Sequence, residues 1–253
     1  MPKESFDRFR RQILARCVSA QVSERLSEIG QFQQTRRAER IVLSATGDQL
    51  VFLAEGATKL IVRMPDASEH VLAFHFPGDM IYVPQPEQGA ISMLALADCR
   101  TIAFPANSFL EIAEAEPSVL RTILARTLLA LQRCRNKAIR LGRKSAQERI
   151  TDFLLAMADR IGVPDGNSIR LNLPMSRRDI GNSLGLTIET VSRQFTELRN
   201  EHLISTAGRS IVRLHHLDEL ATRAGHVSRS NTQAKICAES KSGLRPGAIA
   251  AAD

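Results

Sequence analysis

Residues 175–195, MSRRDIGNSLGLTIETVSRQF, hold two helix-start signals and a glycine within about twenty positions. Ser176 and Asp179 have the capping-box spacing, in which each side chain accepts a hydrogen bond from the other residue's backbone amide. Gly185 permits the positive φ that a sharp turn between helices requires. Because Thr187 can cap the next helix, we expect two short helices joined by a tight turn.

The apolar spacing assigns faces to these two helices, the second of which runs from about Ile188 to Arg199. Expected on the buried side are Ile180, Leu184, Val191, Phe195 and Leu198, with Gly181 where the two axes cross. The arrangement matches a helix-turn-helix, whose second helix enters the major groove of DNA. The alternative, an ordinary α-hairpin, would more often show Glu–Lys ladders.

The outward positions of the second helix suit contact with bases. An arginine binds guanine bidentately, a glutamate accepts from cytosine, and serine reaches base or phosphate. A following hairpin, two short strands about the turn Ala207-Gly208-Arg209, would add a wing. The residues expected to contact DNA are Glu189, Ser192, Arg193, Thr187, Ser176, Arg177, Thr196 and Arg209.

The charge of the chain also favours a polyanionic partner. The net charge is +7 and the isoelectric point is near 9.7. Residues 121–149 contain nine lysines and arginines against one acid, Glu148. Each such cation that meets a phosphate releases condensed counterions. Double-stranded DNA is therefore the expected partner, although a merely basic surface is the alternative on charge alone.

A long helix is expected over residues 118–144, which contain no proline and only one glycine, Gly142. Its apolar residues alternate at spacings of four and three, as in a heptad seam. The seam positions are Leu120, Leu124, Thr127, Leu131, Cys134, Ala138 and Leu141. A narrow apolar stripe on a basic helix favours a partner helix, so we expect a homodimer; the alternative is packing against the chain's own β unit.

The rest of the chain divides around that helix. Residues 1–117 combine a helical stretch, Phe6 to Ile29, with short apolar runs and turns typical of a β unit. Residues 145–225 begin with a capping box at Ser145 and include a short linking segment, VPDGNSIRLNLPM, before the helix-turn-helix. Residues 226–253 have few large apolar side chains, so we expect a disordered tail.

Several function classes receive no support. No apolar run approaches the roughly 18 residues of a membrane span, and the start of the chain is charged, so a cytoplasmic protein without membrane contact is expected. The four cysteines are far apart, with no pair typical of a zinc site or disulfide scaffold. None of the six histidines has a catalytic or metal-ligand pattern, so we expect neither an enzyme nor a metal site.

Separate segments of the chain, in the family's order, resemble the CRP/FNR family of bacterial transcription regulators over residues 20–220. FLAEGATKLIV and VLAFHFPGDM resemble its β-roll, RTLLALQRCRNKAIRLGRKSAQERITDFLL its dimer helix and hinge, and LISTAGRSIVRL its wing. RRDIGNSLGLTIETVSRQF is most similar to the FNR and FixK branch. The implied fold is α+β: an N-terminal cyclic-nucleotide-binding-like β-roll, a long dimerisation helix and a C-terminal winged helix-turn-helix.

The resemblance also implies a function. The branch's E-x-x-S-R motif falls on Glu189, Ser192 and Arg193, and Ile188 stands where CRP-type proteins have arginine. That favours an inverted repeat of the TTGAT–ATCAA type. A symmetric dimer that recruits RNA polymerase, as an activator of low-oxygen, respiratory or nitrogen-related genes, is what the family implies.

No cofactor is expected. In the family, a glutamate and an Arg-Ser pair bind cyclic AMP. These positions fall on Val83, Gly89 and Ala90, which provide no cation for the phosphate. An iron–sulfur cluster of the FNR type needs grouped N-terminal thiolates and one internal thiolate. Only Cys17 lies near the N-terminus, and the position of the internal cysteine is occupied by Ile102, although Cys99 is nearby. We expect control by abundance, as in some FixK-type regulators. Alternatives are gating by a small molecule, by haem through His70 or His75, or by oxidation of Cys134; a remote one is an enzyme or ligand-binding module built on the β unit.

Overall fold

The computed structural model describes residues 2–14, 18–43, 47–65, 68–85 and 91–226. The chain begins with two helices, α1 (Pro2–Gln12) and α2 (Ala20–Ile29). The single helical stretch expected from Phe6 to Ile29 is therefore wrong in detail, because Ser19 starts a new helix: its Oγ accepts from Val22 N at 3.3 Å. The tail expected over residues 226–253 lies outside the described residues, except for His226.

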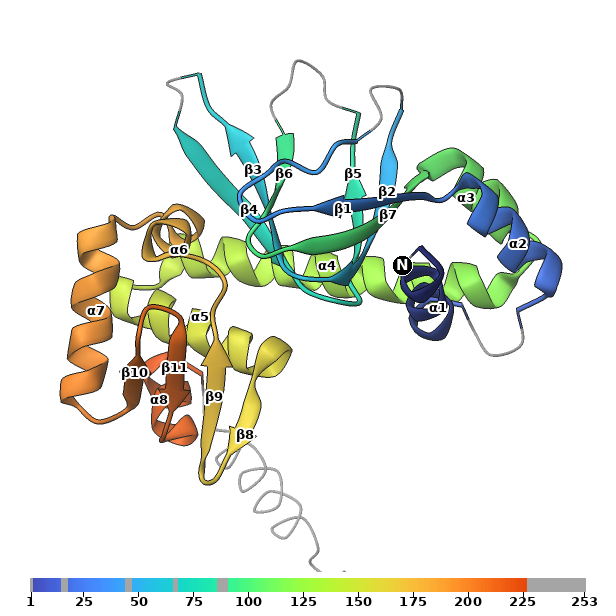
Figure 1. Cartoon of the computed structure of the whole chain (residues 1–253). Helices are drawn as coiled ribbons and strands as arrows, with labels where there is room; N and C mark the ends of the chain where they lie inside the picture. Colours follow the sequence, from blue (N-terminus) through green and yellow to red (C-terminus); the bar gives the residue numbers. More distant parts are fainter. Residues whose placement is uncertain (1, 15–17, 44–46, 66–67, 86–90, 227–253) are drawn as a thin grey trace, which may run out of the picture.

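Seven strands form an antiparallel β-roll of two sheets (Figure 1). One sheet has the order β1-β7-β2-β5 and the other β4-β3-β6. The strands are β1 (Gln31–Thr35), β2 (Gln49–Glu55), β3 (Thr58–Arg63), β4 (Glu69–His75), β5 (Met80–Val83), β6 (Ile91–Ala95) and β7 (Cys99–Pro105). A tight turn at Glu55-Gly56 joins β2 to β3: Gly56 has φ +88, and an added Cβ would lie 2.4 Å from Asp98 O.

Alternation along the strands fills two cores. Val51 and Leu53 of β2 point between the sheets, where they meet Met93 of β6. Leu50 and Phe52 point the other way, toward α1, α2 and α3 (Ala106–Ala113). Successive strand residues face opposite sides, so one strand serves both cores. In the described part of the roll, the space between the sheets is occupied by apolar side chains.

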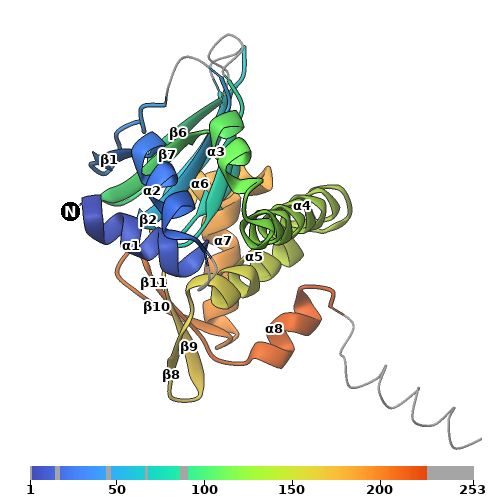
Figure 2. The same cartoon turned by 90° about the vertical axis from the view of Figure 1, so that its right-hand side faces the viewer.

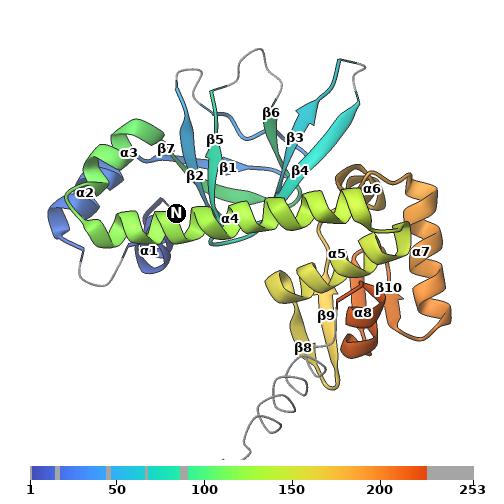
Figure 3. The same cartoon turned by 180° about the vertical axis from the view of Figure 1, so that it is seen from behind.

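The expected long helix is α4 (Pro117–Arg143), 27 residues that lie along one side of the molecule (Figures 2 and 3). Pro117 stands in its first turn, where its missing amide is not needed. Only Val119 on this helix is buried. No described helix is long and apolar enough to cross a membrane.

The C-terminal part begins with α5 (Ala146–Ile161), and the capping box of Ser145 and Glu148 is confirmed. The elements that follow are β8 (Val163–Asp165), β9 (Ser168–Asn172), α6 (Arg177–Leu184), α7 (Ile188–Asn200), β10 (Ile204–Ala207), β11 (Ile211–Leu214) and α8 (Leu217–Arg223). The sheet has the order β10-β11-β9-β8. The linking segment expected before the helix-turn-helix is therefore half wrong, because it holds the β8–β9 hairpin. The mixed fold with a β-roll, a long helix and a winged helix-turn-helix is confirmed.

Candidate DNA-binding surface

The turn between α6 and α7 has the local geometry expected from its residues. Ser176 Oγ accepts from Asp179 N at 3.1 Å, and Asp179 Oδ2 accepts from Ser176 N at 2.9 Å. Gly185 is left-handed at φ 63 and ψ 41. A Cβ on Gly181 would lie 2.6 Å from Leu186 O, so the close approach of the two helices requires glycine there. Both helices are confirmed, α7 one residue longer than expected.

Helix α7 buries one side and exposes the other. Val191, Phe195 and Leu198 are buried. The predicted base-contacting residues Glu189, Ser192, Arg193 and Thr196 are all exposed. Arg193 has 67% of its side chain exposed, and its Nε lies 3.9 Å from Glu197 Oε1. The side chain is therefore free to extend away from the helix.

The start of α7 keeps its acid ionised. Thr187 Oγ1 accepts from Thr190 N at 3.2 Å and so caps the helix. The backbone amide of Glu189 and the hydroxyl of Thr187 hold the pKa of Glu189 below its ordinary value. An ionised carboxylate only accepts hydrogen bonds, which suits a cytosine amino group.

Two residues predicted to contact DNA make contacts within the chain. The Arg177 guanidinium lies 3.2 Å from the centre of the Phe195 ring, and its Nη1 is buried without a hydrogen-bond partner among the described residues. Burial, and secondly the charge of Arg199, lower the pKa of Arg177 to about 10. The Ser176 hydroxyl donates to Asp179 Oδ2 at 2.7 Å. Arg209, by contrast, is exposed at the β10–β11 turn, where Gly208 has φ 62.

Sequence reasoning missed residues that hold the helix-turn-helix in place. Lys59 of β3 donates to Asp179 Oδ1 at 2.6 Å. Arg149 of α5 donates to Leu184 O at the end of α6 at 3.1 Å, and to Leu141 O at 2.7 Å and Lys144 O at 2.8 Å at the end of α4. The Lys59–Asp179 contact has no local sequence signal, because the two residues are 120 positions apart.

On α4, the exposed apolar residues differ partly from the predicted seam. Leu124 and Leu131 of the seam are 60% and 44% exposed. Thr127, Cys134 and Ala138 are also exposed, whereas Leu120 packs partly against the core of the β-roll and Leu141 is half-buried. Leu128, which the seam omits, is 55% exposed and lies between Leu124 and Leu131 at spacings of four and three. We call Leu124, Leu128 and Leu131 the leucine stripe.

The opposite side of α4 uses its cations within the chain. Arg126 Nη1 donates to Gly78 O at 2.5 Å, and Lys137 Nζ donates to Val71 O at 2.5 Å and to Leu72 O at 2.9 Å. Burial, with a smaller effect from Arg140, lowers the pKa of Lys137 to about 8. Part of the basic charge of residues 121–149 is therefore turned toward the β-roll rather than toward a polyanion.

The positions considered for an effector show no assembled site in the described part of the chain. Val83 is buried between the sheets, while Gly89, Ala90 and Cys17 lie outside the described residues. Cys99 is buried, which raises the pKa of its thiol. His70 is half-buried, and burial lowers its pKa. No group of three or more metal-ligating side chains occurs among the described residues.

Comparison with known proteins agrees with this geometry. A family model described as a Crp-like helix-turn-helix domain matches residues 148–223. The transcriptional activatory protein AadR of Rhodopseudomonas palustris is 33% identical over 157 residues, which cover 62% of this chain and 66% of AadR. The nitrogen fixation regulation protein FixK of Azorhizobium caulinodans is 31% identical over 198 residues, 76% of this chain and 80% of that protein.

Solved structures are similar along most of the chain. FixK2 from Bradyrhizobium japonicum matches with a TM-score of 0.65 and 29% identity, over 77% of this chain and 96% of that one. A CooA mutant from Carboxydothermus hydrogenoformans has a TM-score of 0.69 over 83% of this chain and 92% of that chain at 17% identity, a likeness of fold alone.

The matched stretches leave part of two relatives uncovered: the chain covers 66% of AadR and 64% of the FixK of Bradyrhizobium diazoefficiens, just under two thirds of each. The match to the Azorhizobium FixK and the match to FixK2 are wider. The helix-turn-helix, the β-roll and these relatives together show that the chain belongs to the CRP/FNR family of DNA-binding transcription regulators, in its FixK-like branch.

Proposed function

We propose that the chain is a homodimeric regulator that binds an inverted repeat of the TTGAT–ATCAA type through Glu189, Ser192 and Arg193 of α7. The observation that supports the proposal is the exposed polar side of α7, on a helix whose other side is buried in the winged helix-turn-helix. Residues 118–144 would form the dimer and residues 145–225 would bind DNA, with residues 1–117 as the attached β unit.

Each residue has a role in this proposal. Arg193 would bind guanine, Glu189 would accept from a cytosine amino group, and Ser192 would contact a base or phosphate. Thr187, Thr196 and Arg209 lie exposed around α7 and at the wing, where backbone phosphates run. Arg177 would exchange its contact with Phe195 for a phosphate, and Ser176 would contribute through the start of α6 rather than through its hydroxyl.

Dimerisation would use the leucine stripe. Exposed leucines at spacings of four and three form a narrow stripe on a helix. Packing against a second helix removes this apolar surface from water. No described part of the chain covers the stripe: Leu124, Leu128 and Leu131 are all exposed. The second copy of α4 would therefore lie along these leucines, bringing two DNA-binding units to one palindromic site.

The regulated genes are proposed from the relatives. FixK is named for nitrogen fixation regulation, and AadR, FnrL and Anr are named as transcriptional activators. We propose that this chain activates low-oxygen, respiratory or nitrogen-related genes by recruiting RNA polymerase in the cytoplasm. Control by abundance is favoured by the apolar filling between the two sheets of the roll. An oxidation switch at the exposed Cys134 of α4 is the second candidate.

The test is a binding titration with purified dimer and three labelled duplexes: the full inverted repeat, a single half-site and a scrambled sequence. The full repeat should bind about a thousandfold more tightly than the scrambled duplex at physiological salt. The logarithm of the affinity should fall linearly with the logarithm of the salt concentration for all three, because phosphate contacts release counterions. Equal affinity for repeat and scrambled duplex would overturn the proposal.

A further inference from the structure

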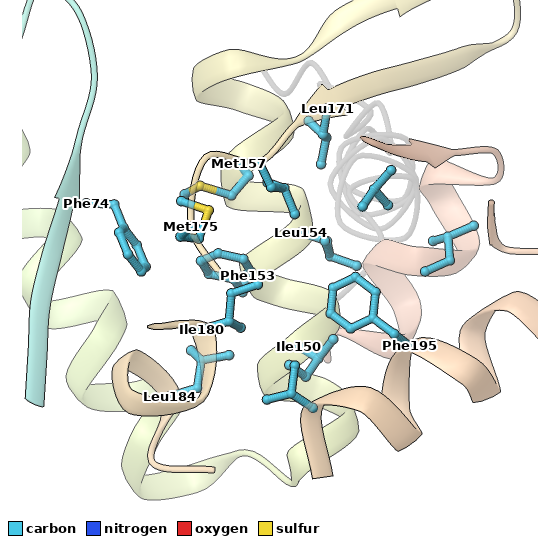
Figure 4. Close-up of a cluster of buried hydrophobic side chains, with 14 of the residues drawn as sticks. Phe74, Ile150, Phe153, Leu154, Met157, Leu171, Met175, Ile180, Leu184 and Phe195 are labelled. Carbon is cyan, nitrogen blue, oxygen red and sulfur yellow. The ribbon is translucent and has the colours of Figure 1, made fainter. Parts of the chain in front are cut away.

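The β-roll and the winged helix-turn-helix share one apolar core. Phe74 of β4 meets Phe153 of α5 edge to face, with ring centres 6.1 Å apart. The same cluster contains Ile61 of β3 and Ile180 of α6. Figure 4 shows Phe74 pointing toward Phe153 and Met175. Domains within one chain are expected to move relative to each other unless their interface is large and apolar, and this interface is apolar.

At one place in this interface, an ion pair joins β3 to α6. Lys59 Nζ lies 2.6 Å from Asp179 Oδ1, and 14% and 12% of the two side chains are exposed. The other carboxylate oxygen, Oδ2, accepts from Ser176 and caps α6. One carboxylate therefore starts the first helix of the helix-turn-helix and fastens it to the β-roll.

A second ion pair joins the β4–β5 turn to α5. Asp79 Oδ2 accepts from Arg160 Nη2, and Arg160 Nη1 donates to Phe74 O at 2.7 Å. The Arg160 guanidinium also lies 4.6 Å from the centre of the Phe76 ring. Both members of the pair are largely buried, with 17% and 18% of their side chains exposed. Arg133 of α4 approaches the other oxygen of Asp79 at 3.5 Å.

The apolar core and the ion pairs make different contributions to this interface. Apolar burial is nondirectional and roughly proportional to area, so it permits sliding of one unit over the other. Largely buried ion pairs with hydrogen bonds add little net stability, but they require one geometry. Two such pairs, one on α6 and one on α5, would fix both the position and the rotation of the DNA-binding unit.

The fixed orientation leaves the DNA-binding surface uncovered. Figures 1 and 3 show α7 on the far side of α6 from the β-roll. The side chains of Glu189, Ser192 and Arg193 are exposed in this arrangement. The contact with the β-roll therefore holds the helix-turn-helix without masking it.

We propose that Lys59–Asp179 and Asp79–Arg160 form an interdomain clamp, which sets the orientation of each DNA-binding unit and hence the half-site spacing that the dimer accepts. The inference rests on the proposed function. In a palindromic complex the distance between recognition helices must match the distance between half-sites. A clamped dimer accepts one spacing, and an unclamped dimer accepts several at lower affinity.

The experiment compares Lys59→Met, Arg160→Met and the double variant with the unchanged chain. Lys59→Met removes the clamp contact and leaves the cap of α6 intact. Binding is measured on a single half-site and on inverted repeats whose spacer is optimal, one base pair shorter, or one and two base pairs longer. Lys59→Arg and Arg160→Lys are the conservative variants that keep the charge, and Arg25→Met, at an exposed position on α2, is the matched control.

We expect the double variant to bind the optimal repeat about tenfold more weakly, since fewer molecules are in the competent orientation. Half-site affinity should stay within twofold, and the loss caused by a changed spacer should shrink. The conservative variants should restore the sharp spacing optimum. A double variant with the original affinity and spacing optimum would overturn the clamp, and so would an equal loss on half-site and full repeat, which indicates damage to the helix-turn-helix.

A second measurement needs no DNA and separates the clamp from the proposed function. Spin labels at exposed Leu110 of α3 and Asn200 of α7, in a cysteine-free chain diluted with unlabelled chain, report the distance between the two units. We expect a narrow distribution that broadens in the double variant. An unchanged distribution would overturn the clamp, whereas failure of the unchanged chain to bind any repeat would overturn only the proposed function.

Discussion

Helices α7 and α4 are amphipathic in opposite senses. Helix α7 buries Val191, Phe195 and Leu198 and exposes polar and charged side chains. Helix α4 turns cations such as Lys137 and Arg126 toward its own chain and exposes the leucine stripe. The same pattern of apolar residues at spacings of three and four therefore serves two different kinds of contact. On α7 it builds the core of a small domain, and on α4 it remains available to another chain.

Whether the exposed side of each helix is apolar or polar depends on what packs against its other side. The carbonyls of Val71 and Leu72 accept from Lys137, and the carbonyl of Gly78 accepts from Arg126. Lysine and arginine can bury their aliphatic stems while their charged ends bind carbonyl oxygens. This side of α4 meets the edge strand β4 and the β4–β5 turn, whose carbonyls accept hydrogen bonds, so cations suit it better than leucines would.

The largest expected effect is on the exposed side of α4. Leu128→Glu combined with Leu131→Glu should weaken dimerisation about a hundredfold or more, because two carboxylates per chain would be buried against like charges. Sedimentation velocity measures the dissociation constant.

Thr127→Glu with Cys134→Glu is the matched comparison, because both residues belong to the predicted seam but not to the leucine stripe. We expect this variant to dimerise more tightly than the leucine variant. If the two variants lose dimerisation equally, the contact extends across the whole predicted seam instead.

On α7 we expect an intermediate effect. Arg193→Ala should reduce binding to the inverted repeat by about 1 to 3 kcal/mol while leaving scrambled duplex nearly unchanged, because a bidentate contact to guanine carries sequence information. Arg25→Ala removes the same charge from an exposed position on α2 and is the control. Equal losses on both duplexes would make Arg193 a phosphate contact.

The smallest effect concerns Lys137. Burial lowers its pKa to about 8, from 10.5. Between those values the unfolded chain holds a proton that the folded chain has released, so raising the pH favours the folded state. The free energy of unfolding of the unchanged chain should therefore rise relative to Lys137→Met from pH 8 to pH 10. Urea titrations at pH 7, 8, 9 and 10 measure the difference, and a constant difference would exclude the burial of a charged Lys137.

Much of the winged helix-turn-helix could be predicted because its signals are local. The two residues of the capping box, Ser176 and Asp179, are only three positions apart, and Gly185 alone marks the turn. The β8–β9 hairpin also has a local signal, since Gly166-Asn167 is a typical two-residue turn between short strands and Gly166 has φ 61. The role of Lys59 could not be predicted from the sequence, because only the tertiary structure brings it to its partner Asp179.

The predicted seam of α4 shows a different limit. Its positions include Leu120 and Leu141, whose apolar surface is partly used inside the chain at the two ends of the helix. Periodicity counts apolar residues without distinguishing contacts inside the chain from contacts with a second chain. The seam stays a prediction, and it omits three exposed apolar residues of α4: Leu128, Leu129 and Ile139.

The shared carboxylate of Asp179 has a consequence for how such proteins diverge. Oδ2 serves the helix start, which any working helix-turn-helix needs, while Oδ1 is available to a partner from elsewhere in the chain. A single substitution at position 59 would gain or lose the link to the β-roll without altering one residue of the DNA-binding motif. Two relatives with identical recognition helices can therefore inherit different demands on operator spacing, a difference that a comparison of their motifs alone would not reveal.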